Sequence, residues 1–235
     1  MKKIKRFLED SIFKKIESES KKYYKKNEPG HDWNHILRVV ALCKNMMKDK
    51  GANERVLIPA AFLHDIICLP KNDPNSSSSS SLAALKSLEL LEDCGFSERE
   101  IIDISNAIED HSYSRGRTPR SLEGKILQDA DRLDALGAIG VLRCASVATN
   151  MGGAFYHEED FWAKNRPYND KKFMIDHYET KLFKLPQSMN TDWARKEALK
   201  RVEFMKLFRS QLVGELDGEA CSLKLSEYCS PKDLI

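Results

Sequence analysis

Residues 56–67 read VLIPAAFLHDII, a run that is apolar on almost every side until His64 and Asp65 interrupt it. A helix without a polar face belongs in the centre of a protein, so we predict a buried central helix over about 54–68, ended by Pro70. A carboxylate in such a helix costs several kcal/mol unless it is paired or binds a cation. This stretch alone therefore leaves two alternatives open: a hydrogen-bonded histidine–aspartate pair inside a core, or a metal site.

Helical periodicity continues through nearly the whole chain, and almost no segment alternates with the period of two that is typical of a strand. Further helices are predicted over about 4–23, 32–50, 82–93, 98–111, 121–149, 169–185 and 191–215. Residues 70–81, PKNDPNSSSSSS, combine two prolines with six serines and predict a mobile surface loop that does not pack. The predicted fold class is all-α, a single helical bundle with a C-terminal helical extension.

Composition and charge argue against several classes of protein. Hydrophobic residues make up 41% of the 235 residues and charged residues 31%, which is ordinary for a globular protein and too apolar for a disordered one. The 38 basic and 36 acidic side chains give a formal charge of +2, so neither nucleic acid nor a membrane is expected as a partner. Lysines and acids alternate along the N-terminal segment, which predicts a solvated helix face rather than a nucleic-acid arm, a signal peptide or a spanning helix. We therefore expect a cytoplasmic protein.

Cysteines and histidines are distributed differently in this chain. No two of the six cysteines form a C-x-x-C pair, so we expect neither a disulfide framework nor a thiolate zinc cluster, and interpret most of them as small buried hydrophobes. Four of the six histidines, in contrast, lie inside short polar clusters. One cluster is GHDWNHILRVV, where His31 and His35 stand four residues apart and share one face of a helix.

Three aspartates interrupt the otherwise apolar and small-residue helix that contains QDADRLDALGAIG: Asp129, Asp131 and Asp134. Several buried carboxylates of one sign repel one another strongly unless a metal or another cation neutralises them. Imidazole and carboxylate ligands together suit Mn, Mg, Fe, Ni or Zn rather than a soft copper site. The three polar clusters thus favour a divalent metal site over an isolated core pair.

The ordered set His35, His64-Asp65 and Asp131 resembles the HD superfamily of metal-dependent phosphohydrolases. The strings HDWNHILRV, FLHDIICLPKN, DHSYS and QDADRLDALGAIG are similar to its YedJ-like branch of small hydrolases, over roughly residues 28–215. The resemblance implies that the metal ligands are His35, His64, Asp65 and Asp131. Asp129 and Asp134 are then interpreted as supporting groups. It also implies an N-terminal helix (1–27), an HD-domain catalytic core (28–150) and a helical extension (151–235).

The resemblance implies further roles around this metal. Asp65 would orient the attacking water, and His111 would contact the substrate phosphate as a second catalytic or binding group. The alternative for His111 is an exposed histidine favoured by the dipole of a helix C-terminus. Lys71 would meet a phosphate as a point charge, or else is a solvated loop lysine. His31 would orient His35 or border the substrate pocket, since metal-bound histidines need such partners.

The implied activity is hydrolysis of a nucleotide or another small phosphate ester, as a nucleoside triphosphate pyrophosphohydrolase or phosphatase. Cys68 stands where the 5′-nucleotidases and guanosine tetraphosphate hydrolases of this superfamily carry a glutamate, which disfavours those two activities unless Asp73 or Glu109 substitutes. A non-catalytic sensor module that binds metal and nucleotide is the alternative function. The apolar stripes of the two C-terminal helices fit an intramolecular core and a homodimer contact equally well.

Overall fold

A computed structural model of the chain describes residues 2–24, 30–48, 51–69, 73–92, 94–112 and 116–218, with the backbone alone for residues 2–10. Its regular elements are all helical, apart from one isolated bridge between Ala154 and Phe173. The α-helices are α1 (Lys2–Ser20), α2 (Trp33–Met47), α3 (Glu54–Leu63), α4 (Ser79–Leu91), α5 (Glu98–Asp110), α6 (Leu122–Asp134), α7 (Gly137–Asn150), α8 (Met174–Thr180) and α9 (Asp192–Leu216). Two 3-10 helices, η1 (Ser76–Ser78) and η3 (Leu182–Ser188), join them. The all-α prediction is confirmed.

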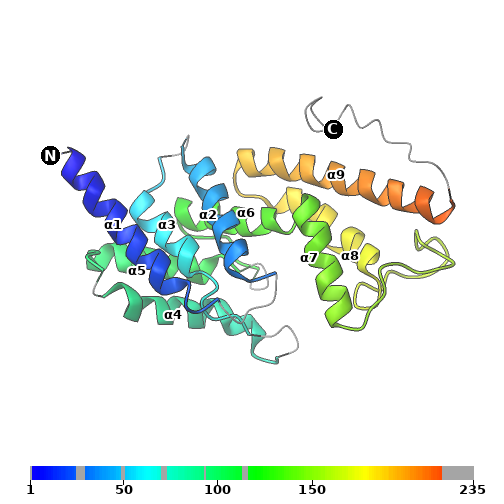
Figure 1. Cartoon of the computed structure of the whole chain (residues 1–235), viewed down its shortest axis with the longest axis horizontal. Coiled ribbons are helices and arrows are strands. Elements are labelled where there is room, and N and C mark those ends of the chain that lie inside the picture. Colours follow the sequence, from blue (N-terminus) through cyan, green and yellow to red (C-terminus); the bar gives the residue numbers. More distant parts are fainter. Residues whose placement is uncertain are drawn as a thin grey trace.

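Helix α3 is the centre of the bundle. Every residue from Val56 to Leu63 is buried, and α1, α2, α5 and α6 all pack against this one helix. Figure 1 shows α1, α4 and α5 around α3 at one end of the molecule and α7, α8 and α9 at the other, with α6 between the two groups. The prediction of a buried central helix is thus correct, and the polar residues at its end lie deep in the protein.

The predicted end of this helix, at about residue 68, is wrong. Helix α3 stops at Leu63, and His64 and Asp65 lie in the turn that follows. The side chain of His64 donates to the carbonyl oxygen of Ala61, which in a continuing helix would accept from the backbone of Asp65. His64 is the C-cap of α3 and keeps a right-handed helical backbone, whereas the helix does not continue to Asp65.

The predicted single helix over 121–149 is also wrong, because the chain turns sharply between α6 and α7. Gly137 begins α7 with a φ of 73°, a left-handed conformation that residues with a Cβ rarely adopt. The predicted helix over 169–185 is likewise divided into α8 and η3, with Pro186 inside the latter. The bend after α6 brings Arg143 of α7 back toward the end of α6, where its guanidinium contacts Asp134.

Gly140 is the second glycine that this bend requires. A Cβ added there would lie 2.4 Å from the carbonyl oxygen of Ala135, an overlap that only a backbone shift can relieve. We expect Gly140→Ala to lower the free energy of unfolding by about 1–3 kcal/mol, measured by denaturant titration. Leu142→Ala in the same helix is the control, because Leu142 is 66% exposed and should change stability by less than ~0.5 kcal/mol. Equal stability of the two variants would contradict this account of the bend.

The serine run is helical, so the predicted loop is wrong for residues 76–81; residues 73–75 form a bend and a turn, and residues 70–72 lie outside the described part of the chain. Ser76–Ser78 form η1, and α4 begins directly after it at Ser79. The hydroxyl of Ser79 accepts from the backbone nitrogen of Leu69 at 3.1 Å and donates to the carbonyl oxygen of Ser76 at 2.9 Å. Ser80 is buried. Serine side chains are small, so the first turn of α4 can pack closely against the bundle. The composition of the segment does not predict this packing.

Deleting residues 76–81 is therefore expected to destabilise the protein, because it removes the first turn of α4 together with the contacts of Ser79 and Ser80. We expect a loss of at least about 2 kcal/mol, or roughly 4–8 °C in melting temperature, measured by calorimetry. Ser77→Ala is the matched control, since Ser77 is exposed and should melt within about 2 °C of the wild type. If the deletion variant melts like the control, residues 76–81 do not contribute to the packed structure, and the prediction of a loop is correct.

Two negative expectations can be compared with the described part of the chain. None of its helices combines the length and the apolarity needed to cross a membrane. No disulfide links the four cysteines in those ranges: Cys43 and Cys94 are buried, Cys144 is half-buried and Cys68 is exposed. Cys221 and Cys229 lie outside the described residues.

Candidate metal centre

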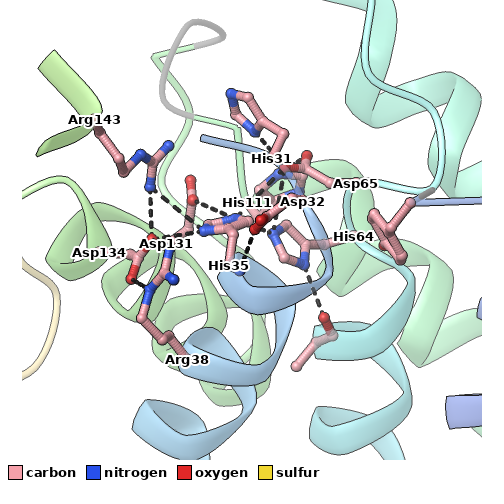
Figure 2. A network of polar contacts seen from close by, with 12 residues as sticks. His31, Asp32, His35, Arg38, His64, Asp65, His111, Asp131, Asp134 and Arg143 are labelled. Atoms are coloured by element: carbon pink, nitrogen blue, oxygen red, sulfur yellow. Dashed lines mark hydrogen bonds and ion pairs between the residues drawn. The ribbon is translucent and has the colours of Figure 1, made fainter. Parts of the chain in front are cut away.

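Side chains from four helix ends and turns converge beside the C-terminus of α3 (Figure 2). His35 lies in the first turn of α2, which Asp32 caps by accepting from the backbone nitrogen of His35 at 2.9 Å. His64 and Asp65 lie in the turn after α3, and His111 follows the last residue of α5. Asp131 projects from α6. Residues that are separate in sequence thus surround one small space.

The ligand atoms in this space are closely spaced. His35 Nε2 lies 3.3 Å from His64 Nε2, 3.5 Å from Asp131 Oδ1 and 3.7 Å from Asp65 Oδ2. His64 Nε2 is 3.7 Å from the same Asp65 Oδ2, and His111 Nε2 is 3.7 Å from Asp65 Oδ1. Both His35 and His64 are fully buried, whereas the Asp131 side chain is 23% exposed. The cluster therefore meets solvent on the Asp131 side.

His35 and His64 are each held in one tautomer. His35 Nδ1 lies 2.8 Å from Asp134 Oδ2, and His64 Nδ1 lies 2.8 Å from the carbonyl oxygen of Ala61. A carboxylate or carbonyl oxygen only accepts, so each ring carries its proton on Nδ1. When both rings are neutral, the two Nε2 lone pairs face each other across 3.3 Å, an arrangement that is repulsive without a proton or a metal cation between them.

The charge states in the cluster also suit a cation. Burial lowers the pKa of His64 to about 4, which keeps its imidazole neutral and able to coordinate. Burial opposes ionisation of Asp65, yet His64 and His31 hold its pKa well below the ordinary value. Burial likewise opposes ionisation of Asp131, but His35 and other neighbouring histidines lower its pKa. Two carboxylates and two imidazole lone pairs form a donor set typical of a divalent transition metal or Mg²⁺.

The spacing of these atoms is compatible with such an ion. Ligand atoms about 2.0–2.2 Å from a metal lie roughly 3–3.6 Å from one another. The separations given above join His35 to His64, Asp65 and Asp131, and His64 to Asp65; they run from 3.3 to 3.7 Å, at or just beyond that range. The ligand atoms of His35, His64 and Asp131 all lie within 4.8 Å of one another. The residues present therefore fit a divalent cation, and the arrangement does not distinguish among Mn, Mg, Fe, Ni and Zn.

Asp134 fixes the orientation of His35. Besides His35 Nδ1, its carboxylate accepts from Arg38 Nε at 2.6 Å, Arg38 Nη2 at 2.9 Å and Arg143 Nη1 at 2.8 Å. The Asp134 side chain is only 1% exposed. Burial opposes its ionisation, but the hydrogen bonds from His35 and Arg38 lower its pKa far below the ordinary value. A carboxylate behind a histidine is the usual support of a metal-bound imidazole.

The three aspartates of QDADRLDALGAIG thus face three different surroundings. Asp131 faces the cluster and Asp134 faces His35, as described above. Asp129 accepts from the backbone nitrogens of Asn190 and Thr191, each at 2.8 Å, and so holds the start of α9. Arg38 and Arg143, which both donate hydrogen bonds to Asp134, were not predicted from the sequence. For Arg38 a signal existed, because it follows His35 by three residues on the same helix face.

His31 and His111 both contact Asp65, from different sides. His31 Nδ1 lies 2.8 Å from Asp65 Oδ2; although burial opposes it, the charge of Asp65 raises the pKa of His31 to about 10. His111 Nδ1 lies 2.6 Å from the carbonyl oxygen of Ile108, which directs Nε2 at Asp65 Oδ1. His111 is buried rather than exposed. Both histidines therefore border the cluster.

Three residues considered in the sequence remain: Lys71, Asp73 and Glu109. Lys71 lies outside the described residues. Asp73 Oδ1 accepts from the backbone nitrogen of Asn75 at 2.7 Å. Glu109 forms ion pairs with Arg120 at 3.0 Å and Arg117 at 3.6 Å. The two acids considered as replacements for a glutamate at position 68 are therefore engaged in other contacts.

Known proteins resemble this chain over most of its length. A family model described as the HD domain matches residues 32–136. The Bacillus subtilis protein YpgQ is 32% identical over 193 residues, which span 80% of this chain and 86% of YpgQ. The crystal structure of YpgQ in complex with ADP matches with a TM-score of 0.67 and 29% identity, over 88% of this chain and 96% of the other. An HD-superfamily hydrolase from Bacillus thuringiensis matches with a TM-score of 0.69 and 30% identity, over 90% and 100% of the two chains.

Proposed function

We propose that this chain, which belongs to the HD-domain superfamily of hydrolases, is a metal-dependent phosphohydrolase with His35, His64, Asp65 and Asp131 as its metal ligands. One observation carries the proposal. Two buried imidazoles, each with Nδ1 held by an oxygen acceptor, point their Nε2 atoms at each other and at the carboxylates of Asp65 and Asp131. A bound divalent ion acidifies a water molecule and polarises a phosphoryl oxygen, which is the chemistry that phosphate hydrolysis needs.

Asp65 is proposed to orient the attacking water. Its Oδ2 faces His35 and His64, while its Oδ1 faces His111 at 3.7 Å. An oxygen atom of water or phosphate beside Oδ1 would thus lie within reach of both Asp65 and His111. His111 is proposed to hold the transferred phosphate or to move a proton at its Nε2, because its Nδ1 is already committed to Ile108. His31 is proposed to support Asp65 and border the substrate.

The proposed substrate is a nucleotide, with release of phosphate or pyrophosphate. Support comes from YpgQ, which is 32% identical to this chain and has been crystallised with ADP. Cys68 and the contacts of Asp73 and Glu109 disfavour the activities that use a glutamate three residues after the aspartate. A nucleoside triphosphate or a related nucleotide therefore fits better than a nucleoside monophosphate.

A release assay tests this function directly. Purified protein is incubated with nucleoside mono-, di- and triphosphates in the presence of Mn²⁺, Mg²⁺, Ni²⁺ or Zn²⁺, and both phosphate and pyrophosphate are measured. We expect release that depends on the metal, is greatest for a di- or triphosphate, and is absent from Asp131→Ala. Tight metal binding without release from any nucleotide would contradict the hydrolase and favour a sensor module.

A further inference from the structure

A second group of metal-ligating side chains lies beside the proposed centre, around the other contact of Asp65. The ligand atoms of His31, Asp65 and Cys68 all lie within 4.8 Å of one another. His31 precedes α2 and Cys68 lies in the segment after α3, so two separate parts of the chain bring these side chains to Asp65. Neither His31 nor Cys68 belongs to the ligand set proposed above.

The chemistry of this group differs from that of the first centre because it includes a thiol. Cys68 is exposed, and the His31 side chain is 25% exposed, so an ion can reach both from solvent. A thiolate, an imidazole and a carboxylate together form a ligand set typical of Zn²⁺, whereas Mg²⁺ and Mn²⁺ prefer oxygen ligands. Three protein ligands leave the fourth position of a tetrahedral site open to water.

We propose that His31, Asp65 and Cys68 form a second cation site, which binds a thiophilic divalent ion such as Zn²⁺ and shares Asp65 with the first centre. This site goes beyond the proposed function, since hydrolysis at the first centre requires neither the thiol nor a second ion. In a tetrahedral zinc site, nitrogen, oxygen and sulfur ligands lie roughly 3.3–3.6 Å apart. Metal binding therefore requires that the His31–Asp65 contact of 2.8 Å lengthens slightly and that Cys68 approaches from within 4.8 Å. The imidazolium of His31 and the thiol of Cys68 each release a proton to solvent in this step.

The shared carboxylate couples the two sites. Asp65 Oδ2 lies 2.8 Å from His31 Nδ1 and 3.7 Å from both His35 Nε2 and His64 Nε2. An ion bound to His31 and Cys68 would be coordinated by Asp65 Oδ2, the same oxygen that faces the first centre. Occupancy of the second site is therefore expected to change the metal affinity of the first, and the reverse effect must be equal.

Cobalt substitution tests the second site through a property that only sulfur ligation produces. Co²⁺ bound to a thiolate gives a sulfur-to-metal charge-transfer band in the near ultraviolet, which histidine and carboxylate ligands do not give. The titration uses the full chain with Cys221 and Cys229 replaced by serine. We expect the band to appear with Co²⁺, to saturate with no more than two ions per chain because the first centre also takes one, and to be at least tenfold weaker in Cys68→Ser at equal Co²⁺.

Two variants control this experiment. Cys144→Ser should keep the band, because Cys144 is half-buried on α7 and belongs to none of the groups of metal-ligating side chains in the described residues. Asp131→Ala should also keep it, since Asp131 belongs to the first centre alone, and this result separates the second site from the proposed hydrolase. Circular dichroism is used to check that Cys68→Ser folds, which is expected because the side chain is exposed. Absence of the band in the parent protein, or its persistence in Cys68→Ser, would overturn the second site and leave the proposed hydrolase standing.

Discussion

His64→Ala is expected to lose its bound metal and its phosphohydrolase activity together. His64 Nε2 lies within 3.3–3.7 Å of ligand atoms on His35 and Asp65, so no other side chain can take its place without rearranging the cluster. A metal contributes several kcal/mol of transition-state stabilisation, which corresponds to a fall in turnover on the order of a thousandfold. Metal content by mass spectrometry and turnover with the best nucleotide are measured on the same samples.

His177→Ala is the matched control for His64→Ala. His177 lies on α8, where its ring contacts Asp170 at 3.4 Å with the side chain 30% exposed. The control should keep both metal and turnover near the wild-type values, because a surface histidine contributes no ligand to the cluster. Full metal content and turnover in His64→Ala would contradict the proposed ligand set.

Asp134→Ala is expected to have the largest effect on stability. The substitution leaves Arg38, Arg143 and His35 without their common carboxylate. Removing one partner of a buried charge network costs about 3–5 kcal/mol. For a chain of this size the loss corresponds to roughly 6–20 °C in melting temperature. Thermal unfolding in excess chelator measures this effect without any contribution from bound metal.

Asp131→Ala provides the contrast. Asp131 is partly exposed, and the neighbouring histidines that lower its pKa outweigh the repulsion by Asp65, so the metal-free protein loses a favourable interaction when this carboxylate is removed. In chelator the variant should melt below the wild type but above Asp134→Ala, because the Asp131 carboxylate is more exposed than that of Asp134, whereas metal binding should fail. Asp134→Asn keeps an acceptor for His35 and should weaken metal binding by about 10- to 100-fold. If Asp134→Ala melts like Asp131→Ala in chelator, the network around Asp134 does not stabilise the fold.

The sequence was sufficient to predict the helical class and the burial of α3. The reason is that VLIPAAFLHDII has no polar face, and burial is the only arrangement that covers such a helix. It was also sufficient to predict that His35, His64, Asp65 and Asp131 lie together. Apolar surroundings and a family resemblance both point to these residues, and the structure places them around one space. Their role as metal ligands stays a prediction.

Other features depended on contacts that no local pattern contains. Arg38 and Asp134 are 96 residues apart, so sequence spacing could not reveal that one carboxylate joins Arg38, Arg143 and His35. Helical periodicity continued smoothly across Gly137, although a glycine after Leu136 is a recognised sign of a helix boundary. The serine run was read from composition, whereas its order depends on the contact between Ser79 and Leu69.

The most direct test of the metal centre is an anomalous difference map from a crystal of the wild-type protein grown with Mn²⁺. The proposed ligand set predicts a peak within about 2.0–2.4 Å of His35 Nε2, His64 Nε2, and one oxygen each of Asp65 and Asp131. A peak elsewhere in an active protein, with none between these four side chains, would contradict the proposed centre.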